Sequence, residues 1–190
     1  MSFARVDIIK LGYFKWIKKF ESCKASCTVT LVRDGDSNLI VDTGNPSDEK
    51  AIREGLRKFK LTPRDIDYVI ITHYHPDHIG CNMLFKHAVF IDFADFYKGD
   101  KFNFFEKECE VTKNVKVIAT PGHTYDSCSA LVKCKEGIVA IVGDTFWTNK
   151  QDKLPAFYEN LRQLKSSRKK ILRLADYIIP GHANIFKVKK

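Results

Sequence analysis

The chain has 190 residues, 44% hydrophobic and 12% aromatic, with 32 Lys and Arg against 23 Asp and Glu for a formal net charge of +9. These values argue against intrinsic disorder and suit one domain, residues 1–190, with a sizeable core. The sequence has no run of about 18 apolar residues and no apolar stretch behind the N-terminal charges, so we expect no membrane span and no secretory signal. We therefore expect a cytoplasmic protein, or a nuclear one if the source is eukaryotic.

The positive charge is concentrated in the C-terminal quarter. Residues 145–190 carry 11 Lys and Arg against 3 acidic residues, whereas residues 1–144 carry 21 against 20. Such a region can steer an anionic substrate or bind a nucleic-acid backbone, and the alternative is a solvated helix face that serves solubility alone. The six cysteines form no C-x-x-C pair, so we expect reduced thiols.

The first half of the chain predicts strands followed by a helix. Runs rich in β-branched residues lie at 6–14, 26–35 and 39–44, and the turn-rich DGDSN between the last two indicates a hairpin. Ser47 is the expected N-cap of a helix, and the residues around Pro63 end that helix.

The second half alternates short strands with helical segments. The continuous apolar run at 68–72 is typical of a strand that is buried on both faces. Further strands are expected at 88–92, 115–120, 129–133, 138–144 and 177–181, with a helix at about 156–175. This order predicts a layered α/β domain. The segment 145–158 has no clear period, and we expect it to be a mobile loop.

The segment THYHPDHIG places three histidines and an aspartate after the predicted strand at 68–72. His73 and His75 share a face because side chains at positions i and i+2 of extended chain point the same way. Pro76 suits the first turn of a helix, from which Asp77 and His78 would project on the other side. One short segment can thus present two pairs of metal ligands.

Three more candidate ligands each follow a predicted strand: His123, Asp144 and His182. Loops at strand ends are where α/β proteins commonly place active sites, so these residues predict a metal centre at one rim of the sheets. Imidazole and carboxylate without thiolate suit Zn²⁺ first, with Fe or Mn as alternatives, and seven ligands suit two ions. His87 is left without a role.

The H-x-H-x-D-H order, with the segment LIVDTG ahead of it and TPGHT around His123, resembles the metallo-β-lactamase superfamily over about residues 25–188. The resemblance implies a four-layer αββα sandwich with two Zn²⁺ ions per chain. By it, one ion is held by His73, His75 and His123, the other by Asp77, His78 and His182, and Asp144 bridges the two. The resemblance also makes Asp77 and His182 the expected catalytic residues. The commonest class B β-lactamases have cysteine at the position of Asp144, so antibiotic hydrolysis is not expected.

Within the superfamily, the C-terminal run SSRKKILRLADYIIPGHANIFKV resembles metallo-β-lactamase domain-containing protein 1 and its short relatives. That group is described as a zinc endoribonuclease of histone pre-mRNA 3′ ends. The resemblance implies a metal-bound hydroxide that attacks a phosphodiester of single-stranded RNA. Arg162, Lys165 and Lys169 would then bind the substrate. The aromatic residues expected to stack on bases are Phe146, Trp147, Phe157 and Tyr158.

Other substrates and reactions stay open at this point. The alternatives are a thioesterase or lactonase of glyoxalase type that acts on small metabolites, and a mononuclear iron persulfide dioxygenase with much the same motif. Hydroxyl groups of Thr124, Tyr125 and Ser127 would touch substrate or serve the structure. Another anionic substrate could replace RNA, and a homodimer is one alternative for the oligomeric state.

Overall fold

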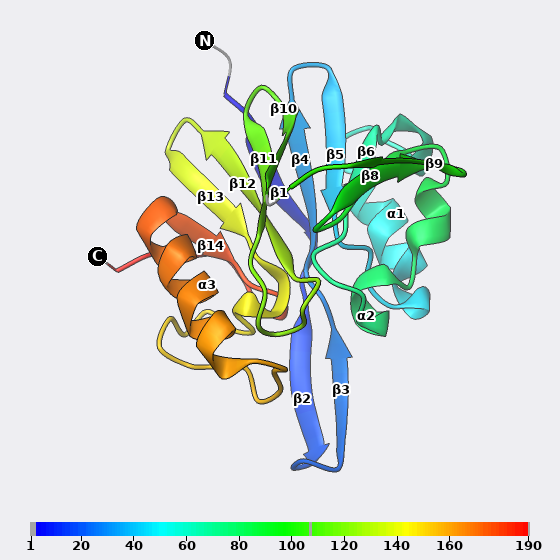
Figure 1. The fold of residues 1–190 in the computed structure, drawn as a ribbon. Coiled ribbons are helices and arrows are strands. Elements are labelled where there is room, and N and C mark those ends of the chain that lie inside the picture. The colour runs from blue at the N-terminus through cyan, green and yellow to red at the C-terminus, as the bar shows by residue number, and fades with distance from the viewer. Residues whose placement is uncertain (1–2, 107, 190) are drawn as a thin grey trace.

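The computed structural model describes residues 3–106 and 108–189, and its centre is a pair of β-sheets packed face to face (Figure 1). The first sheet has the strand order β1-β4-β5-β6-β7-β8-β9 and the second β10-β11-β12-β13-β14-β15. The strands of the first sheet are β1 (Arg5–Lys10), β4 (Val29–Asp34), β5 (Ser37–Val41), β6 (Tyr68–Ile70), β7 (Val89–Ile91), β8 (Asp95–Lys98) and β9 (Lys101–Phe104). Those of the second are β10 (Glu108–Thr112), β11 (Val115–Ala119), β12 (Cys128–Cys134), β13 (Gly137–Ile141), β14 (Tyr177–Ile179) and β15 (Phe186–Lys187).

Helices cover the outer faces of both sheets, which gives the expected αββα order of layers. The α-helices are α1 (Glu49–Arg57), α2 (Pro76–Ile79) and α3 (Leu161–Leu174), and the 3₁₀ turns are η1 (Pro46–Asp48), η2 (Pro63–Asp65), η3 (Asn82–Phe85) and η4 (Gly143–Thr145). In Figure 1, α1 and α2 lie on the side of the first sheet and α3 on the side of the second. The predicted metallo-β-lactamase sandwich is therefore confirmed.

Three hydrophobic clusters hold these layers together. The central cluster joins the inner faces of the two sheets, for example Val41 and Ile70 of the first with Ala130 of the second. On the outer faces, Ile52 of α1 packs against the first sheet and Ile171 of α3 against the second. Because side chains alternate along a strand, β6 contributes Ile70 to the central cluster and Val69 to an outer one, as its continuous apolar run predicts.

The N-terminal strands differ from the expectation. The run at 6–14 is divided at Leu11 and Gly12, and the run at 26–35 is divided at Cys27 and Thr28. The segments on the far side of these divisions, β2 (Tyr13–Lys18) and β3 (Ser22–Ser26), extend beyond the expected runs. They pair with each other as a separate two-stranded sheet, which projects from the sandwich in Figure 1. Gly12 is required at the division because a Cβ there would lie only 2.7 Å from the carbonyl carbon of Cys27.

The start of the first helix is also different from the prediction. Ser47 lies inside η1, and Asn45 precedes that turn. The Asp48 carboxylate accepts a hydrogen bond from the Asn45 backbone N–H at 2.8 Å, so the acid three residues on closes the turn in place of the predicted Ser47 cap.

The strand directions bring the candidate ligands to one edge. In the first sheet, β5, β6 and β7 are mutually parallel. In the second sheet, β11 and β13 both pair antiparallel with β12, and β14 pairs parallel with β13, so β11, β13 and β14 run in the same direction. The carboxyl ends of β6, β11 and β14 are followed by the segments that hold the candidate histidines, and that of β13 by the segment that holds Asp144. Within the described ranges, no helix is long and apolar enough to cross a membrane. All six cysteines are free thiols.

Candidate metal centre

The HxHxDH segment forms the corner between β6 and α2, as the sequence indicates. Pro76 is the first residue of α2, which carries Asp77 and His78, while His73 and His75 precede the helix. The corner is tied to the first sheet, because Thr43 donates its backbone N–H to the His78 carbonyl at 2.7 Å.

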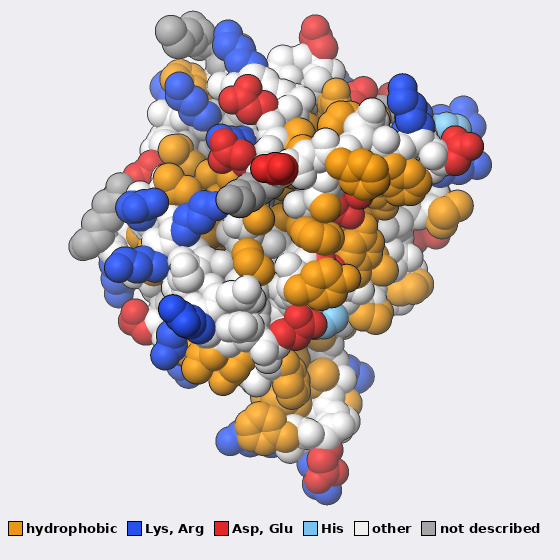
Figure 2. Space-filling model, viewed as in Figure 1, with side chains coloured by type: hydrophobic (Ala, Val, Ile, Leu, Met, Phe, Trp, Pro, Cys, Tyr) orange, Lys and Arg blue, Asp and Glu red, His pale blue; other side chains and the backbone are white. Residues whose placement is uncertain are grey.

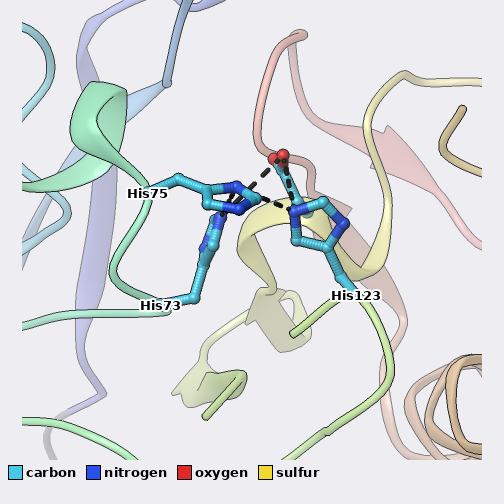
Figure 3. A group of neighbouring side chains, drawn as sticks. His73, His75 and His123 are labelled. Carbon is cyan, nitrogen blue, oxygen red and sulfur yellow. Dashed lines mark hydrogen bonds and ion pairs between the residues drawn. The ribbon is translucent and has the colours of Figure 1, made fainter. Parts of the chain in front are cut away.

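The first group of candidate ligands is His73, His75, His123 and Asp144, whose ligand atoms all lie within 4.8 Å of one another. Figure 3 shows the three imidazoles pointing toward one another from two separate segments of the chain. His75 Nδ1 lies 3.0 Å from His73 Nε2 and 3.1 Å from His123 Nε2. Asp144 Oδ2 lies 3.3 Å from His123 Nε2 and 4.0 Å from His73 Nε2.

The second group is Asp77, His78 and His182, again within 4.8 Å. Its link to the first group is Asp144, because Asp144 Oδ1 lies 3.3 Å from His78 Nε2 and 3.2 Å from His182 Nε2. Asp77 Oδ2 lies 3.7 Å from His182 Nε2. Asp144 Oδ2 also lies 3.4 Å from His182 Nε2. The Asp144 carboxylate thus stands between the two groups of imidazoles, where a bridging carboxylate would lie.

Acceptors behind the ligands fix which ring nitrogen faces the centre. The Nδ1 atoms of His123 and His182 donate to the carbonyls of Phe157 (2.9 Å) and Ser26 (3.0 Å). His78 Nδ1 donates to Asp42 Oδ2 at 2.8 Å. With Nδ1 engaged in this way, Nε2 of each of these three imidazoles faces the centre and is the atom available to a metal.

Asp42 lies directly behind the candidate ligands, and the sequence reasoning missed it. It lies at the end of β5 in the segment LIVDTG, is buried, and accepts hydrogen bonds from the Thr72 backbone N–H and hydroxyl at 2.8 Å each, as well as from His78. The signal was an aspartate directly after a buried strand, the position that marked Asp144. Asp42 and His78 also lie near Cys27, but burial raises the pKa of that thiol well above its usual range, so the thiolate is disfavoured there.

The pKa shifts of the histidines and the aspartate in the first group favour the protonation states that bind a metal cation. Burial and the neighbouring His78 lower the pKa of His73, and burial lowers that of His123, so both favour the neutral form that binds metal. Burial opposes ionisation of Asp144, but His182 and His78 outweigh it and hold the pKa of this carboxyl well below its usual range. Despite burial, Asp42 and Asp144 raise the pKa of His78, and Asp144 raises that of His182.

Two atoms at the middle of the cluster test whether the site fits metal ions. His78 Nε2 and Asp144 Oδ1 are buried and form no hydrogen bond, although they lie 3.3 Å apart. Buried polar atoms are seldom left in this state unless a metal or another group satisfies them. The residues present therefore fit a pair of cations.

The four aromatic residues expected beside the site differ in how far they are exposed. Phe146 is fully buried in the cluster under α3, so the expectation that it stacks on bases is wrong. Trp147 is half-buried and donates its indole N–H to Asp144 Oδ2 at 2.7 Å, a contact that the sequence did not reveal. Phe157 and Tyr158 are 47% and 42% exposed, as a surface role requires.

The segment 145–158, expected to be a mobile loop, is anchored from beneath by a buried arginine. The Arg168 guanidinium donates to the carbonyls of Thr145, Gln151 and Lys153 at 2.6–3.0 Å, and it lies 3.8 Å over the Phe146 ring. This arginine belongs to the basic stretch of α3, so part of that charge serves the fold.

The predicted substrate residues Arg162, Lys165 and Lys169 are exposed on α3, whose first turn rests against the loop of His123. The backbone N–H groups of residues 159 and 160 donate to the His123 and Gly122 carbonyls, each at 3.0 Å. The structure thus brings the start of α3 to the site, while Lys165 and Lys169 lie progressively further along the helix. Their contact with substrate stays a prediction.

The three hydroxyl residues after His123 differ in exposure. Thr124 and Ser127 are buried and hydrogen-bond to each other at 2.8 Å, which is a structural role. Tyr125 is 72% exposed, so its ring is accessible. His87 is exposed after η3 and belongs to neither ligand group.

Comparison with known proteins places this geometry in a family. The sequence profile described as the metallo-beta-lactamase superfamily matches residues 24–93. The chain is 33% identical to metallo-beta-lactamase domain-containing protein 1 of Xenopus laevis, over 97% of this chain and 82% of that relative. The chain belongs to the metallo-β-lactamase superfamily. It is also 38% identical to a probable metallo-hydrolase of Methanocaldococcus jannaschii, over 77% of this chain and 71% of that protein.

Solved structures agree with this assignment. A putative metallo-beta-lactamase from Thermotoga maritima has a TM-score of 0.77 at 21% identity, covering 98% of this chain and all of that one. An N-acyl homoserine lactone hydrolase, solved with its product at the catalytic metal centre, has a TM-score of 0.73 at 18% identity, covering 96% and 94%. At these identities the likeness concerns the fold of the superfamily.

The prediction of a metal-dependent hydrolase is confirmed at the level of the metallo-β-lactamase superfamily, as is the resemblance to domain-containing protein 1. Relatives differ in length. The chain spans 49% of an uncharacterized protein of Caenorhabditis elegans to which it is 33% identical.

Proposed function

We propose that this chain is a dinuclear metal-dependent hydrolase that cleaves a phosphodiester bond of single-stranded RNA. The observation that carries the dinuclear part is the position of Asp144, whose carboxylate stands between two separate groups of imidazoles. Imidazole and carboxylate donors without thiolate suit Zn²⁺, and Fe or Mn accept the same ligands.

Each ligand has a defined task in this proposal. One ion would be held by His73, His75 and His123, the other by Asp77, His78 and His182, and both by Asp144. When bound, such a pair of ions would supply Lewis-acid polarisation of an ester and would lower the pKa of a water to about 7. The Asp77 side chain is 20% exposed, so its carboxylate lies at the ligand group and is still partly accessible from solvent, where it would orient an attacking water. His182 keeps its orientation through the Ser26 carbonyl.

The charge of the surface beside the centre supports an anionic substrate. α3 begins against the loop of His123, and its exposed Arg162 lies in the first turn. Since a helix rises 1.5 Å per residue, Lys165 and Lys169 stand about 4.5 and 10.5 Å further along the axis. Lys and Arg side chains gather over this part of the molecule in Figure 2. In the proposal, these three residues bind successive phosphates of the RNA along the part of the strand that leads away from the metal centre.

A lactonase is the second candidate. It is supported by the structural likeness to the N-acyl homoserine lactone hydrolase, and by the aromatic rings beside the centre, which suit an acyl chain as well as a base. A lactonase does not use the basic residues of α3, so the phosphodiesterase accounts for more of the surface.

A substrate panel with a matched pair of histidine variants tests the proposal. The zinc-loaded protein is assayed with end-labelled single-stranded RNA, bis-p-nitrophenyl phosphate, an N-acyl homoserine lactone and S-lactoylglutathione. We expect cleavage of RNA by the wild type and by His87→Ala, an exposed histidine outside both ligand groups, and none by His75→Ala. Turnover of the lactone or the thioester with no cleavage of RNA would overturn the RNA assignment. Unimpaired turnover by His75→Ala would overturn the site itself.

A further inference from the structure

The hairpin of β2 and β3 has no place in either large sheet, yet it stands beside the metal centre. It projects from the sandwich (Figure 1), and its Phe14 ring lies 6.1 Å from the ring of His182. A two-stranded hairpin is marginally stable by itself in water, so its position depends on what its inner face contacts.

Its inner face contacts the loop that follows Asp144. Phe14 lies over Trp147, with ring centroids 4.4 Å apart, and also approaches the His182 ring at 6.1 Å. Trp16 meets the Phe157 ring edge-to-face at 5.7 Å, and the rings of Trp147 and Phe157 are 5.9 Å apart. Phe14, Trp16, Trp147 and Phe157 thus form one continuous set of rings, the aromatic wall, which begins at the metal ligands.

The aromatic wall is open to a ligand. Phe14, Trp16 and Trp147 are only half-buried, and Phe157 is 47% exposed. Phe20, 65% exposed, extends the row beyond Trp16 at 5.4 Å. Large apolar rings left exposed together at the mouth of a candidate active site indicate a contact surface.

The charge of the hairpin indicates what kind of ligand it takes. Between positions 13 and 24 the chain has four lysines and a single acid, Glu21, which is paired with Lys18 at 2.7 Å. Lys15 and Lys24 stand directly opposite each other on the outer face, and neither forms an ion pair with any residue that the structure describes. Like charges opposite each other in a ribbon are destabilising, and an anion between them removes that cost. Figure 2 shows hydrophobic and basic side chains side by side on this hairpin.

We propose that the β2–β3 hairpin is a binding arm for single-stranded RNA, in which bases next to the scissile phosphodiester stack on the aromatic wall and the lysines of the hairpin hold the phosphates. This inference rests on the proposed phosphodiesterase function and extends it to a second binding element. Aromatic rings beside a positive track are the general means of binding single strands, because every base has a π-face. Neighbouring strands are only about 4.8 Å apart, so lysine amines of the outer face reach round the ribbon edge to phosphates of a strand bound on the inner face.

Trp16 offers the sharpest test, because its neighbour Ile17 is 65% exposed and is not one of the rings of the aromatic wall. The kcat/KM for a 12-nucleotide single-stranded RNA is measured for the zinc-loaded wild type, Trp16→Ala, Trp16→Phe and Ile17→Ala, with zinc content measured alongside. We expect Trp16→Ala to lower kcat/KM by about fivefold or more, the size of one base–aromatic stack. Trp16→Phe keeps a ring and should stay near the wild type, Ile17→Ala should be unchanged, and all four should retain their zinc.

Two further measurements separate stacking from charge. With an abasic strand of the same length, the wild type and Trp16→Ala should have equal kcat/KM, because no base is present to stack. The double variant Lys15→Gln, Lys24→Gln should reduce the slope of log affinity against log salt by about 1.4, from two lost phosphate contacts.

The failures are distinguishable. If the wild type cleaves RNA but Trp16→Ala matches Ile17→Ala, the binding arm is overturned and the phosphodiesterase stands. If the wild type turns over only the lactone, the proposed function fails and the RNA arm with it, before any variant is compared. An unchanged salt slope in the double lysine variant would overturn the role of the lysines.

Discussion

Gly181 gives a way to move Asp144 without replacing it. Gly181 lies directly before His182, and a Cβ at this position would lie well inside 3.0 Å of Asp144 Oδ1, with Gly143 O at 3.1 Å. Its backbone is outside the left-handed region, so alanine adds bulk and no backbone strain. Gly181→Ala therefore pushes the bridging carboxylate and leaves every candidate ligand in the sequence.

The size of the effect follows from the contact distances. Ordinary contacts of a Cβ begin at 3.4 Å, so the Asp144 oxygen must retreat by more than 0.4 Å. Metal–ligand distances tolerate about 0.2 Å, so we expect zinc affinity to fall by at least the 10- to 100-fold typical of changes next to a ligand. The metal-free protein should lose about 1–3 kcal/mol of unfolding free energy, the usual cost of overpacking.

Competition with a chromophoric chelator measures this affinity. Asn184→Ala is the control, since Asn184 is exposed three residues further along and should bind zinc like the wild type. If Gly181→Ala were folded and bound zinc as tightly as the wild type, Asp144 would not be a metal ligand, and the proposal that it bridges two ions would be refuted.

Three other substitutions test separate parts of the structure. Trp147→Phe removes the indole N–H that donates to Asp144 but keeps a ring. Chelator competition should therefore show zinc affinity about tenfold weaker, with an unchanged melting temperature. Equal zinc affinity would show that this hydrogen bond does not support metal binding. Arg168→Met leaves three carbonyls without their charged donor, and urea unfolding should show a loss of about 3 kcal/mol; a loss below about 0.5 kcal/mol would contradict the anchoring of the loop. Hydrogen bonds from Asn114 and Thr112 outweigh burial and lower the pKa of Asp34, so its ionised form stabilises the fold above about pH 4, and this stability is lost as the pH falls through the folded-state pKa. Asp34→Asn should flatten that part of the curve of unfolding free energy against pH, and an unchanged curve would refute this assignment.

The sequence was sufficient to predict that the candidate ligands lie together, because each follows a strand. His123 and His182 come directly after apolar runs, and the segment from His73 to His78 includes a proline at the first helical position. Such local signals survive folding, because the carboxyl ends of strands with a common direction meet at one edge. The order of strands and helices predicted a layered α/β domain, and the resemblance of the ligand motifs to the superfamily implied the four-layer sandwich.

The surroundings of the ligands were not predictable, because they depend on contacts between distant segments. Trp147 reads as a loop aromatic in the sequence, and only the fold brings its indole to Asp144. Arg168 reads as part of a solvated helix face, but it points inward beneath the loop. The division of the N-terminal runs at Gly12 follows from close backbone approach to Thr28, which no periodicity reveals.

The metal content of the purified chain tests the central claim most directly. After saturation with zinc and removal of the excess, elemental analysis should find two zinc ions per chain, as two groups of ligands joined by Asp144 require. A single iron per chain, or no metal retained after saturation, would contradict the dinuclear hydrolase.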